Sequence, residues 1–269
     1  MRPGRLLISQ CLSRAPTGAI VNRSKPRLRE GIGLGDARSL TASPDARAIA
    51  TDAGRTRSLA ETAYDAIEQM IISRRLAPGA MVSEGELGAE LALGRTPVRE
   101  ALARLKTIGF VEVHPRRGVL VTPVDVIRHL ELLEVRRPLD ETMARCIIVR
   151  ASDNDLDALQ RHTEGLLVAA GARDREVYFR LKRTLHEAMV GAAYNQTLTS
   201  TMVPLHAQSR RFWYSHEPTA SFQDCAGIHA TIVAGIAARN AERALAGIAT
   251  LFDLLDQMTR RALDRRPLV

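Results

Sequence analysis

The sequence predicts a mainly α-helical protein in which two folded domains follow a basic N-terminal extension. Residues 58–107 show helical periodicity broken by turn residues, and residues 110–121 alternate like two short strands. From Val124 onward, apolar residues recur at helical spacing with almost no strand pattern. The 269 residues, 45% of them hydrophobic, are enough for two ordinary cores.

The extension, residues 1–57, carries most of the net charge of +8. It has 11 basic and 4 acidic side chains, against 8 and 8 in residues 58–122 and 19 and 18 in residues 123–269. It is rich in Arg, Gly, Ser, Ala and Pro and lacks sustained periodicity. Three interpretations stay open: a solvated tail or misassigned start, a basic arm on a phosphate backbone, or an organellar transit peptide.

Cysteine usage and hydropathy exclude several classes of protein. Cys11, Cys146 and Cys225 show neither close pairing nor the spacing of a zinc site, which favours a reducing compartment. No apolar run approaches the length that spans a bilayer. We therefore expect a cytoplasmic protein, with no membrane partner.

Two helices joined by a tight turn are predicted within residues 83–107. Ser83 and Glu86 form a capping box that starts the first of them, and residues 92–94 break it. The second continues with an apolar stripe made of Val98, Ala101, Leu102 and Leu105. Another helix is expected over residues 58–74.

A β-hairpin follows these helices. Residues 110–114 alternate like a strand, residues 115–118 form a turn, and residues 119–121 form the return strand. Met81–Val82 adds a very short strand. Three helices and such a hairpin, or wing, predict a winged helix-turn-helix over residues 58–122.

The first turn of the third helix leaves Arg95, Thr96 and Arg99 facing outward. An arginine there can pair with two acceptors of guanine, and a threonine hydroxyl suits a phosphate oxygen. At the tip of the wing, Arg116 and Arg117 can enter a minor groove, touch phosphates or simply be solvated. The segment is electrically balanced, so DNA binding has to rest on local arginine placement. A protein–protein module is the alternative.

Residues 123–269 predict an all-helical bundle. The expected helices are 124–150, 153–170, 173–193, 195–214, 220–238 and 241–262. Pro138 is expected to kink or interrupt the first of them.

The predicted winged helix-turn-helix resembles the DNA-binding domain of the GntR family of bacterial transcription regulators. The match runs through Leu76–Gly79, Ser83–Glu84, Leu87, Leu91, Arg95–Leu102, Arg104–Leu105, Gly109 and Pro115–Gly118. The resemblance implies that operator DNA is contacted by Arg95, Thr96, Arg99, Arg116, Arg117 and Gly118. The sequence departs from the family at Gly94, where members often have a capping serine or threonine, and at Gly85, where some have a DNA-contacting arginine.

The helical half resembles the FadR-like branch, whose C-terminal bundle, the FCD domain, senses a small molecule. The matching positions are Glu134–Arg136, Leu185–His186, Asn195, His229, Ile232 and Ile236. The resemblance as a whole covers residues 58 to about 262.

Many members of that branch bind a divalent metal through one aspartate and three histidines. Here His186 and His229 are kept, whereas Lys182 stands at the aspartate position and Leu251 at that of the final histidine. Two imidazoles alone bind a metal weakly, and a nearby ammonium repels it. We therefore expect no metal and no cofactor, and treat the two histidines as vestigial metal positions.

Lys182 and His186 lie one helical turn apart on a stripe that faces the bundle interior. A buried lysine needs an anion. We therefore expect Lys182, His186, His229 and Arg136 to bind a carboxylate-bearing metabolite. The alternative is a lysine that reaches solvent beside hydrogen-bonded core histidines.

Together these features predict a ligand-responsive bacterial transcription regulator, located with the nucleoid. It is expected to bind a pseudo-palindromic operator as a homodimer, one half-site per subunit. Its effector is expected to be an organic acid, and repression is the family default. A metal-dependent hydrolase and a constitutive DNA-binding regulator with a decayed pocket are the alternatives. The incomplete ligand set argues against the enzyme.

Overall fold

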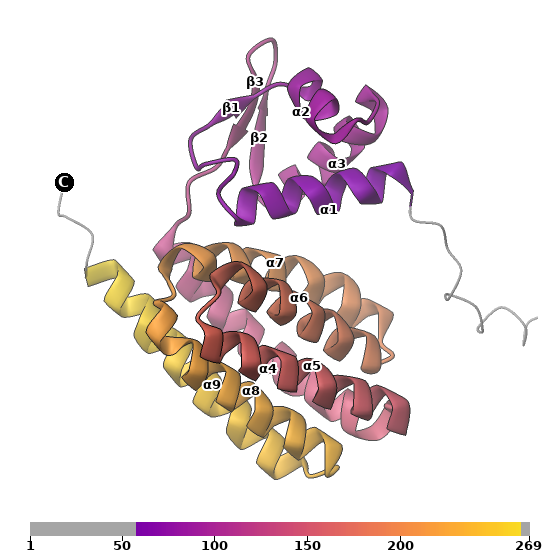
Figure 1. Ribbon diagram of the computed structural model, residues 1–269, viewed down its shortest axis with the longest axis vertical. Coiled ribbons are helices and arrows are strands. Elements are labelled where there is room, and N and C mark those ends of the chain that lie inside the picture. The colour runs from indigo at the N-terminus through magenta and orange to yellow at the C-terminus, as the bar shows by residue number, and fades with distance from the viewer. Residues whose placement is uncertain (1–57, 265–269) are drawn as a thin grey trace, which may run out of the picture. The chain divides into compact units, whose positions relative to one another are not determined.

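The computed structural model describes residues 58–264, and the interpretations of residues 1–57 lie outside this range (Figure 1). The described chain is mainly helical and contains one small sheet. Its N-terminal elements are α1 (Leu59–Ile72), β1 (Met81–Val82), α2 (Glu84–Leu91), α3 (Arg95–Thr107), β2 (Val111–His114) and β3 (Gly118–Val121). The helices that follow are α4 (Val126–Arg150), α5 (Asp153–Ala172), α6 (Arg175–Ala192), α7 (Gln196–His216), α8 (Phe222–Ala237) and α9 (Ala241–Asp264), with a short 3₁₀ turn at Thr219–Ser221.

The capping box predicted at the start of α2 is confirmed. The Glu86 backbone N–H donates to Ser83 Oγ over 3.1 Å, and the Ser83 N–H donates to Glu86 Oε2 over 2.8 Å. The helix ends at Ala92, which adopts the left-handed conformation at φ 52°. The glycine that this turn requires lies earlier, because a Cβ on Gly88 would stand 2.9 Å from the Leu93 carbonyl oxygen. α3 therefore starts beside a tight turn.

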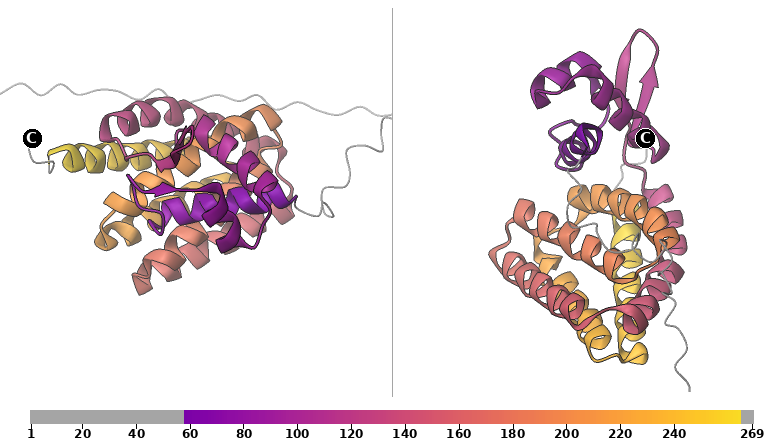
Figure 2. Two further views of the ribbon diagram at one scale, coloured as in Figure 1. Left: turned by 90° about the horizontal axis from the view of Figure 1, so that it is seen from above. Right: turned by 90° about the vertical axis from the view of Figure 1, so that its right-hand side faces the viewer.

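The wing is the β2–β3 hairpin, and β1 completes a three-stranded antiparallel sheet in the order β1-β3-β2. The right-hand view of Figure 2 shows the hairpin. Val113 pairs with Val119 in it, and the short strand predicted at Met81–Val82 pairs with β3. Gly118 has φ 111°, and a Cβ there would lie 2.8 Å from the Val82 carbonyl oxygen. Only glycine fits at the point where the hairpin turns back against β1.

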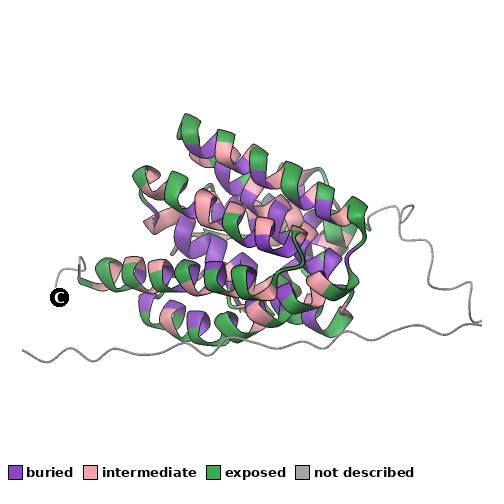
Figure 3. Cartoon of the chain, turned by 90° about the horizontal axis from the view of Figure 1, so that it is seen from below, coloured by how far each residue is buried: buried purple, intermediate pink, exposed green. Residues whose placement is uncertain are grey.

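Two hydrophobic clusters hold these elements together. One joins α1, α2, α3 and the sheet, and it also takes in Ala207 of α7. The other lies inside α4–α9, whose outer faces are exposed and whose inner faces are buried (Figure 3). α9 packs against both α4 and α8, and α6 packs against α5 and α7. The all-helical bundle predicted from the sequence is confirmed.

The interruption expected at Pro138 as one alternative was wrong, and the other alternative, a kink, stays a prediction. α4 runs from Val126 to Arg150 with Pro138 inside it. Proline removes one backbone hydrogen bond from a helix interior. α4 tolerates that loss because α7 and α9 pack along it.

Candidate functional site

The predicted DNA-reading residues lie in the first turn of α3. Arg95, Thr96 and Arg99 are all exposed there. α3 begins without a side-chain cap, because its N-cap residue is Gly94. The first backbone N–H groups of the helix are thus left without a capping side chain, an arrangement that suits an incoming phosphate.

Arg99 is held by a partner that sequence reasoning missed. Its Nη2 lies 2.9 Å from Glu84 Oε2, and its Nε also donates to that carboxylate. The hydrogen bond from Arg99 lowers the pKa of Glu84. Glu84 is the first residue of α2, so the ion pair links the two helices of the helix-turn-helix. Reading DNA with Arg99 requires the guanidinium to leave this carboxylate or to share it.

The wing presents two exposed arginines. Arg116 has φ 64° in the turn of the hairpin, and Arg117 follows it. The conformation of the hairpin already explains why residue 118 is glycine. Its contact with DNA therefore stays a prediction, and the presence of glycine there is no evidence for that contact.

A buried cavity inside the helical domain brings together all four residues predicted to bind an effector. Arg136, Lys182, His186 and His229 line it and are each at most 6% exposed. The remaining lining residues are Phe179, Ser209, Arg210, Trp213, Leu251 and Leu255. The free volume open to the centre of a water molecule is about 10 Å³, which is room for about one water. An organic ligand needs the cavity to open.

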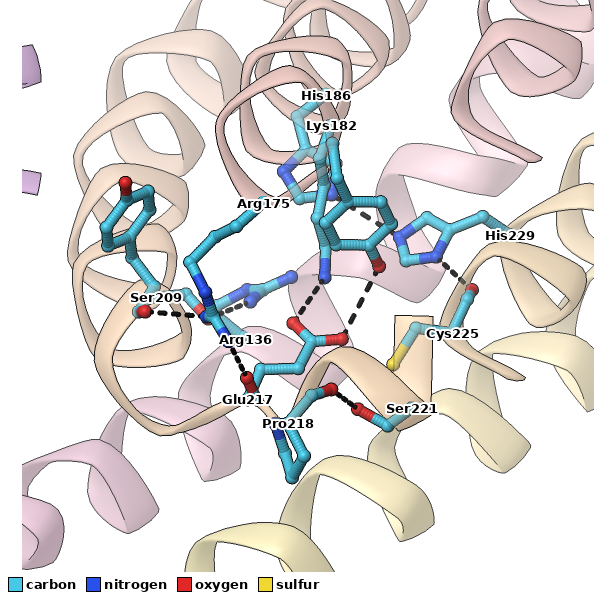
Figure 4. Close-up of polar contacts among 12 residues, drawn as sticks. Arg136, Arg175, Lys182, His186, Ser209, Glu217, Pro218, Ser221, Cys225 and His229 are labelled. Carbon is cyan, nitrogen blue, oxygen red and sulfur yellow. Dashed lines mark hydrogen bonds and ion pairs between the residues drawn. The ribbon is translucent and has the colours of Figure 1, made fainter. Parts of the chain in front are cut away.

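Each positive charge predicted for this site has an internal counter-ion, and Figure 4 shows that of Lys182, which is Glu217. Arg136 donates through Nε and Nη2 to Asp140 Oδ2, over 3.2 and 3.0 Å, and through Nη1 to Ser209. Lys182 Nζ lies 3.5 Å from Glu217 Oε2, and Tyr178 donates to the other oxygen of that carboxylate. Lys182 therefore does not reach solvent. Asp140 and Glu217 were absent from the sequence prediction. Asp140 lies one turn after Arg136 on α4, so the i,i+4 spacing could have indicated this pair, whereas no local pattern places Glu217 beside Lys182.

The histidines of the cavity are neutral. His229 Nδ1 lies 2.7 Å from the Cys225 carbonyl oxygen and so donates to it, which leaves Nε2 as an acceptor 3.4 Å from His186 Nε2. The His206 ring stacks on His186 with the centroids 4.4 Å apart. Burial lowers the pKa of His206 and of His229 to about 4, and it lowers that of His186 as well. His206 was not included in the predicted site, yet its Nε2 lies 3.5 Å from Asp140 Oδ1.

This donor set does not fit a tightly held divalent metal. His186 and His229 supply two imidazoles, but Lys182 brings an ammonium and Leu251 an apolar side chain to the same cavity. Within residues 58–264 no group of three or more His, Cys, Asp or Glu side chains is arranged to hold a metal ion. No metal-dependent chemistry is derived for this site.

Three buried polar atoms of the cavity lining have no hydrogen-bond partner among the described residues. They are His186 Nδ1, Arg210 Nε and Trp213 Nε1. Arginine Nε and indole nitrogen are donors only. The cavity thus offers two free donors to an oxygen acceptor. Arg210 and Trp213 were not included in the predicted site, because an arginine–aromatic run alone does not show which side faces a cavity.

Arg210 also connects the cavity with the winged helix. Its Nη2 lies 3.2 Å from Glu68 Oε2 of α1, and both side chains are buried. Tyr64 donates to the other Glu68 oxygen over 3.1 Å. Arg183 of α6 approaches the same carboxylate to 3.4 Å and pairs with Asp65 over 2.7 Å. A single carboxylate of α1 is therefore bound by arginines from two helices of the bundle.

Comparison with known proteins assigns both halves of the chain. Residues 59–121 match the bacterial regulatory proteins of the gntR family, and residues 131–254 match the FCD domain. A transcriptional regulator from Agrobacterium vitis is 30% identical over 148 residues, which cover 54% of this chain and 86% of that protein. The chain belongs to the GntR family. Within that family, the Nta operon transcriptional regulator of Aminobacter aminovorans is 32% identical over 140 residues.

The match with the Nta operon regulator covers 49% of this chain and 63% of that protein, so under two thirds of the relative is spanned. Among GntR-family folds, the solved structure of E. coli McbR/YncC has a TM-score of 0.68 at 20% identity, covering 77% of this chain and 99% of that one. In the described part of this GntR-family chain, no helix is both long and apolar enough to cross a membrane. The chain thus joins a domain of the gntR family of bacterial regulatory proteins to an FCD domain.

Proposed function

We propose that this regulator is a repressor that binds a pseudo-palindromic operator as a homodimer, and that a small carboxylate-bearing metabolite changes its operator affinity. Arg95 and Arg99 would read base edges, with Thr96 on a phosphate. The wing, with Arg116, Arg117 and Gly118, would follow the adjacent backbone or groove. The exposure of the first turn of α3 supports this assignment.

A two-fold dimer would place one winged helix on each half-site of the operator. Repression is the default that the family resemblance implies. Any effector that holds the two winged helices at a different separation would then release the operator.

The observation that supports an effector-dependent change in operator affinity is that Arg210 contacts both the cavity and the winged helix. Arg210 lines the cavity and is bound to Glu68 of the winged helix. A carboxylate entering beside Lys182, His186 and His229 would meet the free Nε of Arg210 and compete with Glu68 for its charge. Effector binding would thereby change the contact between Arg210 and α1. This gives a coupling free energy between the effector cavity and the DNA-binding domain.

The main competing function is a regulator that binds DNA constitutively. The pairing of Lys182 with Glu217, and a cavity with room for about one water, favour it. In that case the Glu217 carboxylate permanently occupies the place beside Lys182 that a bound carboxylate ligand would take. The two functions differ in whether any carboxylate changes operator affinity.

The test begins with operator DNA selected from a random duplex library by the full-length protein. Fluorescence anisotropy then measures its affinity in titrations with a panel of mono-, di- and tricarboxylates. We expect at least one acid to shift the Kd, and we expect Lys182→Met combined with Glu217→Gln to abolish that shift while keeping DNA binding. The double substitution removes both charges, so neither is left buried and unpaired.

Arg99→Ala tests the DNA half separately. It should weaken specific binding roughly 10- to 100-fold without unfolding the protein, because a base contact is lost from an exposed side chain. Arg75→Ala is the matched control, since Arg75 is exposed and pairs with Glu90 of α2, as Arg99 pairs with Glu84. Equal losses in both variants would remove Arg99 from the interface. No response to any acid, with normal DNA binding, would favour the constitutive regulator.

A further inference from the structure

A second cavity lies at the junction of the winged helix and the helical domain. It is a cleft of about 690 Å³, within the size range of small-molecule sites. The end of α3 and the start of β2 line one side, α4 and α7 line the other, and residues 122–125 close the junction. This cleft is separate from the cavity at Lys182, and no residue is common to the two linings.

Arg211 of α7 lines this cleft and is an exception among the buried charges of residues 58–264. It is 6% exposed. The other buried charged side chains have ionic partners: Arg136 with Asp140, Lys182 with Glu217, and Arg210 with Glu68. Arg211 has no ionic partner among residues 58–264. Within that range its guanidinium donates only to the hydroxyl and the backbone carbonyl of Thr122, and it lies 4.9 Å from the centre of the Phe110 ring.

The electrostatics of Arg211 agree with the missing counter-ion. Burial lowers the pKa of its guanidinium to about 10, and no carboxylate in the described part of the chain offsets that effect. A buried charge without a partner is costly, and proteins generally pair such a group or neutralise it. Arginine stays protonated, so neutralisation by proton loss is not open to it at physiological pH.

Two donor or acceptor atoms at the cleft are also without partners in the described part of the chain. They are Arg211 Nε and His129 Nε2. Arg211 Nε is a donor only, and burial lowers the pKa of His129 to about 2, so its imidazole is neutral. The five partnerless buried atoms of residues 58–264 are thus divided between the two cavities, two here and three beside Lys182.

From the unpaired guanidinium and the ligand-sized cleft, we propose that the cleft at Arg211 is a second anion site that binds a small organic carboxylate. The carboxylate would accept from Arg211 Nε, and the apolar part would lie against Phe110, Leu132 and Phe212, which line the cleft. A phosphate of duplex DNA does not suit this site, because the guanidinium is buried within the cleft. The lining also includes polar and charged residues, among them Glu112 and Asp125, but the apolar side chains of Phe110, Leu132 and Phe212 favour an organic anion over sulfate or phosphate.

Such a ligand would touch both domains. Phe110 belongs to the winged helix, Leu132 and Phe212 to the bundle, and Thr122 to the segment that joins them. A bound carboxylate would neutralise the positive charge of the Arg211 guanidinium, which donates to the Thr122 carbonyl. The site would therefore add a regulatory input at the domain junction, independent of the proposed effector cavity.

The first test needs no ligand. Arg211→Met in the full-length protein removes an uncompensated charge, so its urea midpoint should be equal to or higher than that of the wild type. Arg210→Met is the matched control, and it should lower the midpoint because Glu68 loses a buried partner. A midpoint for Arg211→Met that falls as far as that of Arg210→Met would mean that Arg211 is purely structural, and would overturn the proposal.

The second test uses benzoate and phenylacetate as organic probes and sulfate as the inorganic one, by isothermal titration at constant ionic strength. We expect an organic probe to bind wild type, with its Kd raised roughly tenfold or more in Arg211→Met and little changed in Lys182→Met/Glu217→Gln. Binding lost only in the Lys182 variant would assign the carboxylate to the effector cavity. That result would overturn this proposal and leave the proposed function standing. The same holds if neither organic probe binds, or if sulfate alone binds.

Discussion

Neutralising Glu68 tests how strongly the two domains are coupled. Glu68 is 2% exposed and is the only acid within ion-pair distance of the Arg210 side chain among the described residues. Glu68→Gln therefore leaves a buried guanidinium without a counter-ion. The substitution removes less of the ionic pairing of Arg183, because Arg183 also pairs with Asp65 and Glu187.

Breaking a buried ion pair by removing one partner costs about 3 to 5 kcal/mol, whereas removing both charges is often nearly neutral. We expect Glu68→Gln and Arg210→Met each to lower the free energy of unfolding by an amount near the lower end of that range, since Arg183 and Tyr64 stay near the site. The double variant should lose less than the sum of the two single losses. The coupling energy should lie between about 1 and 3 kcal/mol.

The assay is urea unfolding of the four proteins, followed by far-UV circular dichroism and by the fluorescence of Trp213, the single tryptophan of the chain. Trp213 lies in α7 three residues after Arg210, so its emission reports on the bundle side of the pair. Losses that simply add would refute the reasoning. They would show that Glu68 and Arg210 do not exchange an appreciable interaction energy.

Two further predictions concern the operator face and pH. Glu84→Gln should tighten operator binding because it frees Arg99, whereas Glu90→Gln on the same helix should leave it nearly unchanged; equal effects would mean that only the net charge of α2 matters. Because the pKa of His206 and of His229 is about 4 when folded and about 6.5 when unfolded, acid favours the unfolded chain, and stability present above pH 6.5 is lost as pH falls toward 4. At pH 5 the loss is about 2 kcal/mol for each histidine. Urea midpoints that stay flat from pH 7 to pH 5 would contradict neutral buried imidazoles.

Local signals were enough to predict most of the fold. The Ser83–Glu86 capping box and the alternation of residues 110–121 specify their elements through contacts within a few residues, so both are readable in the sequence. The possible interruption at Pro138 does not occur because a helix that is packed on two sides tolerates a lost backbone bond. The left-handed residue of the turn is Ala92, not a glycine, because the close approach occurs at Gly88.

The candidate effector site was predicted only in part. Helical spacing places Lys182 beside His186, and the family resemblance adds Arg136 and His229, which lie together in one cavity. The partners Asp140 and Glu217 were missed, and so was the bond from Arg210 to Glu68, whose residues are 142 positions apart. The pair of Arg136 and Asp140 follows the i,i+4 spacing of one helix and could have been found in the sequence. The pairs of Lys182 with Glu217 and of Arg210 with Glu68 depend on how helices pack, which no spacing rule in one sequence encodes.

The most direct test of the account is the effector response of Glu68→Gln, measured with the acid that shifts operator affinity in the wild type. Anisotropy gives the operator Kd with and without the acid, and calorimetry gives the acid's own affinity. We expect the acid to bind the variant within about threefold of the wild-type affinity, a difference of under 1 kcal/mol, while its effect on the operator Kd largely disappears. An operator shift as large as that of the wild type would show that the Arg210–Glu68 contact does not carry the signal.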